Sequence, residues 1–276
     1  MLARAPVSVL IPCYCCADTV GRAVASAMNQ TLPPAQIVLV EDASPDGGRT
    51  LAALERLASE HAGRVPVQVI RMPTNGGPGA ARNLGWEAAT QPYIAFLDAD
   101  DVWHPSKLEL QIGWMEAHPE VALTGSRSAV IRSMGDFPQL SAAVPVKELR
   151  RADILLTNPL PTRSVVLRAG LAQRFVPAKR YSEDYLLWAT ILLSGQRAAV
   201  FDAPLAFSFK RDFGEGGLSS HLWRMQRELL DTYRRLHAAG HIGWGEWLAL
   251  DIVSWLKFVR RVAITMLTRI SNRGVA

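Results

Sequence analysis

The sequence predicts an α/β fold with a mostly parallel central sheet that is flanked by helices. Over the first hundred residues, short apolar runs with β-branched residues alternate with stretches of helical periodicity. This alternation is typical of βαβ units. The run from Tyr93 to Leu97 contains no charged residue, which indicates a strand buried on both faces, like the inner strands of a parallel sheet.

Strands and helices are predicted to alternate in the first hundred residues. The strands are continuous apolar runs, at Val7–Ile11, Ile37–Val40, Val67–Ile70 and from Tyr93 onward. The helices between them are predicted over about 20–30, 51–58 and 80–89. Asp18 or Thr19 is the expected cap of the first helix, and the third opens at the glycine-rich segment Asn75–Gly79.

Beyond Pro105 the pattern is less regular. We expect one helix that ends near His118 and another that runs from Ser182, as its cap, to Leu193. Short strands are predicted over 121–124, 130–131, 165–167, 198–201 and 206–209, with a loop over 134–147. Two final helices are expected over 222–239 and 244–270.

The composition is that of a globular chain with a basic C-terminal quarter. Of the 276 residues, 49% are hydrophobic, and the formal net charge is +5. From Lys210 onward, eleven basic residues face six acidic ones. This surplus favours an anionic partner, either a phosphate-bearing ligand or an anionic membrane surface, and no nucleic acid is expected as a partner.

The cysteines bear on the cellular compartment. Cys13, Cys15 and Cys16 lie too close together for a disulfide between distant elements, and they are too few for a four-ligand zinc site. We expect buried thiols in a reducing compartment. The sequence shows no signal peptide pattern and no uncharged apolar stretch of about 18 residues, so the cytoplasm is the expected location.

The strand predicted at Tyr93 is followed by three carboxylates, those of Asp98, Asp100 and Asp101. Carboxylates repel one another and resist burial, so such a cluster is either hydrated or bound to a cation. Ligands of open α/β sheets lie beyond the carboxyl ends of the strands, and an Asp-x-Asp pair there can hold a divalent metal together with its phosphates. An acidic turn that caps the next helix is the alternative.

Three other stretches carry charged groups. Asp42 ends a second strand, where it can accept a hydrogen bond from a base or a ribose hydroxyl. A turn-initiating Asp is the alternative there. Arg82 stands where a dinucleotide fingerprint would need its third glycine, and it suits a phosphate or a carboxylate instead. Glu183 and Asp184 begin a helix, which helix-dipole stabilisation alone would explain.

Five segments occur in the order seen in family 2 glycosyltransferases, which the chain resembles over about residues 6–210. They are Pro12-x-Tyr14, Glu41-Asp42-Ala43-Ser44, Asn75-x-Gly77 with Ala81-Arg82-Asn83-x-Gly85, Phe96-Leu97-Asp98-Ala99-Asp100-Asp101, and Glu183-Asp184. The resemblance implies the GT-A fold, with a Rossmann-like sheet. It also implies an inverting enzyme that moves a sugar from a nucleoside-diphosphate donor, UDP by default, to the hydroxyl of a lipid-linked or polysaccharide acceptor.

The resemblance further implies a division of the chain and roles for single residues. Residues 1–210 would form the catalytic domain, with donor contacts up to about 105 and acceptor contacts over 106–210, and residues 211–276 a C-terminal part. Asp100, with Asp98, would bind Mn²⁺ or Mg²⁺, and Asp184, with Glu183 beside it, would be the catalytic base. Contacts to the nucleotide sugar are implied for Pro12, Tyr14, Asp42, Asn75, Arg82, Asp98, Lys210 and Arg211.

The chain departs from the family pattern at two places. Many members carry Asn directly after the Tyr, where this chain has Cys15. Many also have a His after the late strands that helps to hold metal or diphosphate. Here Lys210 and Arg211 follow; they could neutralise diphosphate instead, and His221 is a weaker candidate. Gly214, Gly216 and Gly217 would let a lid close over the donor; a merely disordered loop is the alternative.

Two other functions fit the residues less well. A sugar-phosphate nucleotidylyltransferase would need a glycine-rich basic loop after the first strand, which Cys13–Cys16 does not provide. A sugar-nucleotide binder without activity would need no base, so Asp184 argues against it.

The segment Trp244–Arg273 has an apolar face opposite basic residues, as in a helix that docks on the cytoplasmic membrane face. Packing on the catalytic domain is the alternative.

Overall fold

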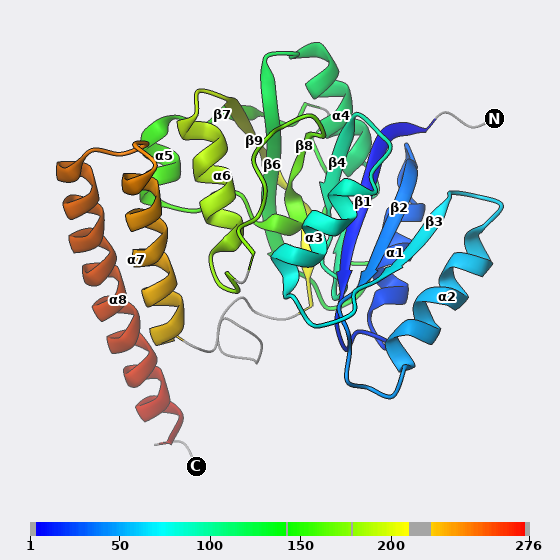
Figure 1. Cartoon of the computed structure of the whole chain (residues 1–276), viewed down its shortest axis with the longest axis horizontal. Coiled ribbons are helices and arrows are strands. Elements are labelled where there is room, and N and C mark those ends of the chain that lie inside the picture. Colours follow the sequence, from blue (N-terminus) through cyan, green and yellow to red (C-terminus); the bar gives the residue numbers. More distant parts are fainter. Residues whose placement is uncertain (1–3, 142, 178, 210–221, 274–276) are drawn as a thin grey trace. The chain divides into compact units, whose positions relative to one another are not determined.

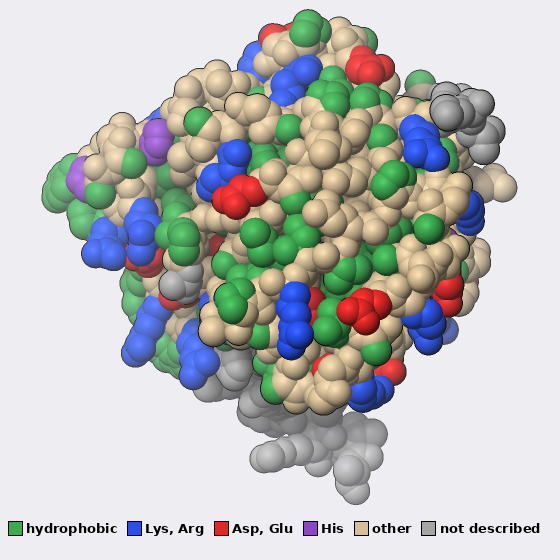
Figure 2. All heavy atoms as spheres, turned by 45° about the vertical axis from the view of Figure 1, so that its right-hand side comes forward, with side chains coloured by type: hydrophobic (Ala, Val, Ile, Leu, Met, Phe, Trp, Pro, Cys, Tyr) green, Lys and Arg blue, Asp and Glu red, His purple; other side chains and the backbone are tan. Residues whose placement is uncertain are grey.

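The computed structural model describes residues 4–141, 143–177, 179–209 and 222–273, with the side chains of 222 and 262–273 left out. The chain forms two compact units, Met1–Asp212 and Phe213–Ala276 (Figure 1). On the face shown in Figure 2, acidic and basic side chains are interspersed among hydrophobic and uncharged ones, as is usual for the surface of a globular protein.

One sheet organises the first unit. Among the described residues it has nine strands in the order β3-β2-β1-β4-β8-β6-β9-β5, with β7 paired to β9 off this path. The strands are β1 Ala5–Cys13, β2 Pro34–Glu41, β3 Val67–Arg71, β4 Tyr93–Phe96, β5 Asp101–Trp103, β6 Val121–Val130, β7 Val146–Glu148, β8 Val166–Arg168 and β9 Arg197–Ser208. The first four pair in parallel, as predicted, and beyond β4 the pairing is antiparallel except between β6 and β9.

Helices pack on the faces of this sheet. They are α1 Val20–Met28, α2 Arg49–His61, α3 Pro78–Glu87, α4 Lys107–Ala117, α5 Arg151–Leu156 and α6 Glu183–Leu193, with a short 3₁₀ turn, η1, at Thr162–Ser164. Side chains of a strand alternate between its two faces. Val9 and Ile11 of β1 therefore share a core with α1, whereas Leu10 lies on the other face, against α3.

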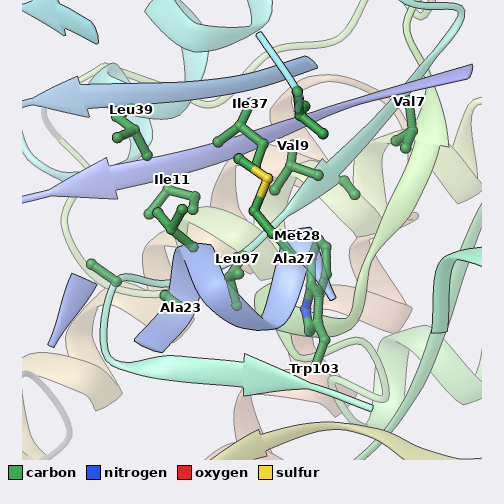
Figure 3. Packing of buried hydrophobic residues seen from close by; sticks show 14 of the residues in the cluster. Val7, Val9, Ile11, Ala23, Ala27, Met28, Ile37, Leu39, Leu97 and Trp103 are labelled. Atoms are coloured by element: carbon green, nitrogen blue, oxygen red, sulfur yellow. The ribbon is translucent and has the colours of Figure 1, made fainter. Parts of the chain in front are cut away.

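The core on the α1 face is formed by apolar side chains at helical spacing. Ala23, Ala27 and Met28 are buried against Val9 and Ile11. Figure 3 shows these side chains gathered between the helix and the strands. Burying a side chain of the size of methionine stabilises the fold by roughly 1.5–3 kcal/mol, so this face anchors the parallel half of the sheet.

Helix α3 consists largely of small residues because it lies close to the sheet on one side and to Phe175 on another. A Cβ on Gly85 would come within 3.3 Å of Val40 Cγ2 and 3.4 Å of Leu10 Cδ2, and one on Gly79 within 3.2 Å of Phe175 Cβ. These distances are shorter than ordinary van der Waals contacts between carbon atoms. The close approach of α3 brings Arg82, on its second turn, to the carboxyl end of the sheet.

The second half of the sheet departs from the prediction. The strands predicted over 121–124 and 130–131 are one strand, β6, and the late pair is one strand, β9. The register between them shifts beside Arg127 and Pro204. Because proline cannot donate a ladder hydrogen bond, such an irregularity interrupts the sequence pattern of a continuous strand. Elements α5, β5 and β7 were not predicted, because they are too short for periodicity to mark them.

Thr19 and Ser182 are the N-cap residues of α1 and α6, as predicted, but both lack the expected hydrogen bond, and one predicted burial is wrong. Neither Thr19 nor Ser182 makes a side-chain capping hydrogen bond, and Ser182 is left-handed with a φ of 54°. The Thr19 hydroxyl donates to Cys16 O at 3.3 Å instead. Cys13 and Cys16 are buried free thiols, but Cys15 is exposed, because the strand has ended and the chain turns there with a φ of 48°.

The second unit contains a pair of packed helices, α7 Leu222–Ala238 and α8 Trp244–Arg273. Gln226 Nε2 donates to Ser254 Oγ at 2.8 Å, and the Trp223 and Phe258 rings lie 4.6 Å apart. Phe258 is therefore buried. Trp244, Leu248, Ile252, Trp255, Leu256 and Val259 are exposed. None of the helices in the described ranges is long and apolar enough to cross a membrane.

Candidate active site

The carboxyl ends of β1, β2 and β4 meet at one edge of the sheet. The three strands are parallel, so the segments that follow them leave at the same edge. These segments contact one another. The backbone N of Asp42 donates to Cys13 O at 2.9 Å, and that of Leu97 donates to Leu10 O at 3.1 Å. The polar groups predicted after these strands therefore share one edge.

Asp42 organises the loop that leads into α3. Its side chain is buried, with Oδ1 accepting from the backbone N of Gly76 at 2.7 Å and Oδ2 from that of Gly77 at 2.9 Å. Asn75 Nδ2 donates to Oδ2 at 3.1 Å, and Arg180 Nη2 donates to Asn75 Oδ1 at 2.5 Å. Neutral donors thus hold this carboxylate, and Oδ1 keeps a lone pair with which it can accept from a ligand.

Arg82 joins three parts of the first unit. Its side chain is only 5% exposed. Nη2 donates to Asp98 Oδ1 at 2.7 Å, and Nη1 donates to Glu183 Oε1 at 2.9 Å. Arg82 therefore ties α3 to the end of β4 and to the start of α6. Of the two partners that suited Arg82 in the sequence, phosphate and carboxylate, the structure shows the carboxylate.

Burial and charge oppose each other in this cluster. Burial tends to lower the pKa of Arg82, but the charges of Asp98 and Glu183 outweigh it and raise that pKa. The guanidinium therefore stays charged. Burial, together with the charge of Asp184, raises the pKa of Glu183 to about 7, against the opposing effect of Arg82. The cluster thus holds one permanent positive charge, that of Arg82, between two carboxyl groups.

Glu183 and Asp184 are neighbours in different environments. Glu183 is buried and held by the guanidinium described above. Asp184 is half-buried. Its Oδ2 accepts from Thr162 Oγ1 at 2.9 Å and from Asn158 Nδ2 at 3.3 Å, and its Oδ1 accepts from the backbone N of Tyr185 at 2.7 Å. Asp184 is therefore the carboxylate of this pair that a group from solvent can reach.

The acidic stretch after β4 is surrounded by arginines. Asp101 is buried, and Arg163 Nη1 lies 3.3 Å from its Oδ2. Burial raises the pKa of Asp101 to about 7, against the opposing charge of Arg163. Arg22 Nη2 donates to Asp100 O at 3.0 Å. Asp98 and Asp100 are only half-buried, so these two carboxylates, unlike Asp101, are accessible from outside.

Asp98 and Asp100 suit a metal ion that binds together with the phosphates of a substrate. Within the described ranges no group of three His, Cys, Asp or Glu side chains is placed to hold a metal. Mg²⁺ is often bound by only one or two carboxylates, with water and substrate phosphates completing its shell. The two half-buried carboxylates are hard oxygen ligands of this kind, so the residues present suit such a cation beside a diphosphate.

Of the remaining predicted site residues, two are described by the structure. Pro12 lies in β1, and Tyr14 follows the strand with half of its surface exposed. Both belong to the carboxyl edge of the sheet. Lys210 and Arg211 lie outside the described residues, as do His221 and the glycines of the expected lid.

Three contacts of the site were not predicted. Asn158 and Thr162 touch Asp184, and Arg163 touches Asp101. All three belong to the chain between α5 and β8, where η1 is the one short element. A polar turn of this length has no periodicity and no motif, so no signal in the sequence distinguishes these residues from those of an ordinary surface turn.

Comparison with known proteins identifies a family. The profile described as Glycosyl transferase family 2 matches residues 8–172. The succinoglycan biosynthesis protein ExoU of Rhizobium meliloti (strain 1021) is 33% identical over 71% of this chain, and the match spans only 60% of that relative. The amylovoran biosynthesis glycosyltransferase AmsE of Erwinia amylovora is 33% identical over 66% of this chain and 67% of the relative.

A further relative and a solved structure agree with this result. The UDP-Glc:alpha-D-GlcNAc-diphosphoundecaprenol beta-1,3-glucosyltransferase WfaP of Escherichia coli is 30% identical over 84% of this chain and 78% of the relative. The crystal structure of S. aureus TarS 1–349 in complex with UDP-GlcNAc superposes with a TM-score of 0.65. That match has 20% identity and covers 83% of this chain and 66% of TarS 1–349. At this identity the likeness shows a shared fold and nothing more. It confirms the predicted GT-A fold.

Proposed function

Because the chain belongs to glycosyl transferase family 2, we propose that it transfers a sugar, with inversion, from a nucleoside-diphosphate donor to the hydroxyl of a glycan or lipid-linked acceptor. The observation that carries the proposal is the position of Asp184. This half-buried carboxylate follows Glu183, which Arg82 ties to Asp98 at the sheet edge. An accessible base and an acidic pair therefore belong to one connected cluster.

UDP is the proposed nucleotide, and the donor is proposed to bind mainly to residues up to about 105. TarS was solved with UDP-GlcNAc, and WfaP is named for UDP-Glc. Asp42, with the backbone of Pro12 and Tyr14, would contact the base or the ribose. The other proposed donor contacts are Asn75, Arg82, Asp98, Lys210 and Arg211.

A divalent cation is proposed at the acidic pair. Asp98 and Asp100 would hold Mn²⁺ or Mg²⁺ at the diphosphate. When bound, the cation would neutralise the charge that develops on the leaving group. Asp98 stays fixed by Arg82 Nη2 at 2.7 Å, so one of its oxygens is oriented before the donor arrives.

Asp184 is proposed to accept the proton of the acceptor hydroxyl. As the acceptor oxygen bonds to the anomeric carbon, its proton passes to Asp184, and the carbon–oxygen bond to the diphosphate breaks. The nucleoside diphosphate leaves with the electron pair of that bond. A base opposite the leaving group gives in-line displacement and inversion. Acceptor contacts are proposed for residues 106–210, the part of the chain that holds Asp184.

The proposed function is tested with the full chain. A panel of nucleotide sugars is first screened for thermal stabilisation with and without Mn²⁺, and release of nucleoside diphosphate is then measured in the absence of acceptor. We expect a UDP-sugar to stabilise the protein in the presence of Mn²⁺ and to be hydrolysed slowly. Metal-dependent binding with no hydrolysis and no transfer to polyprenyl-diphosphate sugars would instead indicate a binding protein.

We also propose that α8 docks the enzyme on the cytoplasmic face of the membrane. Its exposed apolar residues Trp244, Leu248, Ile252, Trp255, Leu256 and Val259 adjoin Lys257, Arg260 and Arg261, which are exposed as well. Apolar side chains with Trp beside basic residues suit the interface of an anionic bilayer. Each basic residue near such lipid adds about 1 kcal/mol, and the contribution falls with salt.

Liposome co-sedimentation tests this docking. The full chain should bind vesicles of phosphatidylglycerol at low salt, and the double variant Ile252→Ser, Val259→Ser should bind several-fold less. Leu156→Ser is the matched control, because Leu156 is an exposed apolar residue of the first unit. If the double variant and the control bind as the wild type does, α8 is not the docking surface.

A further inference from the structure

The 3₁₀ turn η1, Thr162–Ser164, touches both acidic parts of the proposed site. Thr162 Oγ1 donates to Asp184 Oδ2 at 2.9 Å. On the next residue, Arg163 Nη1 lies 3.3 Å from Oδ2 of Asp101, the residue that follows the proposed metal ligand Asp100. Two adjacent residues of one turn therefore connect the start of α6 with the start of β5.

The turn is held firmly on its core side. Trp103 Nε1 donates to Arg163 O at 2.7 Å, and Gln111 Nε2 donates to Ser164 O at 3.1 Å. Trp103 and Gln111 are almost fully buried. Lys107, buried as well, donates to Gln111 Oε1 at 2.6 Å and so fixes that amide. Any displacement of η1 would break buried hydrogen bonds, which is costly away from water.

The Arg163 side chain is held in one orientation. Its Nε donates to Ser128 Oγ at 2.8 Å while Nη1 faces Asp101. The side chain is only 17% exposed. A planar guanidinium with contacts on two edges has little rotational freedom, so it fixes the buried Asp101 and the short strand β5 that begins there.

We propose that η1 is a positioning element, in which Thr162 orients the base toward the acceptor and Arg163 orients the acidic stretch toward the donor. The inference deepens the proposed function and rests on it. Neither residue is expected to touch the reacting atoms. In-line displacement needs base and leaving group within a fraction of an ångström of their productive positions, and one rigid turn that holds both meets this need.

The two residues should affect different kinetic parameters. Thr162→Val keeps the size of the side chain and removes the hydroxyl that stabilises the charged base, so kcat should fall about ten- to hundredfold. Donor KM should change less than about twofold. Thr162→Ser keeps the hydroxyl and should restore most of the activity.

Arg163→Met should act on the donor side. We expect donor KM and the Kd for UDP with Mn²⁺ to rise about tenfold, with a smaller change in kcat at saturating donor. Since this variant leaves Asp101 buried without its counter-charge, folding needs a control. The double variant Arg163→Met, Asp101→Asn removes that charge and should recover the melting temperature without recovering donor affinity.

The variants are compared by hydrolysis of the nucleotide sugar that the wild-type protein hydrolyses fastest, and by calorimetry with UDP and Mn²⁺. A split between kcat for Thr162→Val and donor binding for Arg163→Met supports the proposal. Wild-type kcat in Thr162→Val would overturn it, as would equal changes of kcat and KM in both variants. Full activity of Asp184→Asn would overturn the proposed function itself, whereas an inactive Asp184→Asn with a normal Thr162→Val overturns only the role of η1.

Discussion

The carboxylates at the edge of the sheet are held in two different ways. At the end of β2, Asp42 is held by neutral N–H groups of a loop that lies 33 to 35 positions further along the chain. After β4, Asp98 and Asp101 are held by the guanidinium groups of Arg82 and Arg163. Both arrangements orient a carboxylate at the same edge. The donors are neutral in the first arrangement and positively charged in the second.

The difference determines how each region responds to the loss of a partner. A carboxylate that loses one neutral donor loses one hydrogen bond, and its other donors remain. Removing a buried guanidinium leaves its carboxylates without a counter-charge, which costs more than the ion pair itself contributes. We therefore expect the region around Asp42 to tolerate substitution better than the region around Arg82.

The largest effect is expected at Asp184, whose described donors are also neutral. Asp184→Asn keeps the shape but cannot accept a proton, so transfer should fall by about 10²–10⁴-fold. Because no guanidinium loses its partner, the Kd for UDP with Mn²⁺ should stay close to that of the wild type, and the melting temperature should fall less than when Arg82 is replaced. Near wild-type transfer by this variant would show that Asp184 is not the base.

Arg82→Met should cause the largest loss of stability. It leaves Asp98 and the buried Glu183 without their shared cation, and such changes cost about 3–5 kcal/mol in the free energy of unfolding. Chemical denaturation measures the loss. Arg49→Met is the matched control, because Arg49 pairs with Asp18 at the surface, where both side chains are mostly exposed and little should change. Equal stability of the two variants would contradict the distinction drawn above.

Asp42→Asn should have a smaller effect on stability. One oxygen is replaced by an NH₂ group that faces an N–H donor, which leaves a buried pair unsatisfied at a cost of about 1–3 kcal/mol. The same denaturation experiment compares it with Arg82→Met. If Asp42→Asn proves the more destabilising of the two, the neutral donors around Asp42 hold the site more strongly than the guanidinium does.

The smallest effect is expected at Asp100. Asp100→Ala removes one proposed metal ligand and leaves both arginine clusters in place, so the affinity for UDP in the presence of Mn²⁺ should fall about tenfold, or about 1.4 kcal/mol. Calorimetry with and without Mn²⁺ separates the metal-dependent part of binding. Affinity equal to that of the wild type would reduce the acidic stretch after β4 to a structural turn.

The parallel half of the fold could be predicted because its signals are local. The apolar run that starts at Tyr93 marks a buried strand, and the alternation of such runs with helices marks the βαβ units. Polar residues directly after these runs, such as Asp42 and Asp98, were expected at one edge because parallel strands end at the same edge. In the second half, the irregular register of β6 and β9 and three very short elements left no comparable pattern.

By itself, the sequence determined the fold class, the family and the candidate carboxylates, since period, composition and motif are properties of neighbouring residues. Only the tertiary structure decided how those carboxylates differ. Glu183 and Asp184 are adjacent in the chain, yet Arg82, 101 positions before Glu183, makes one of them a buried partner and leaves the other accessible. Thr162 reaches Asp184 from 22 positions away. Contacts over such separations depend on strand order and helix packing, which no local pattern encodes.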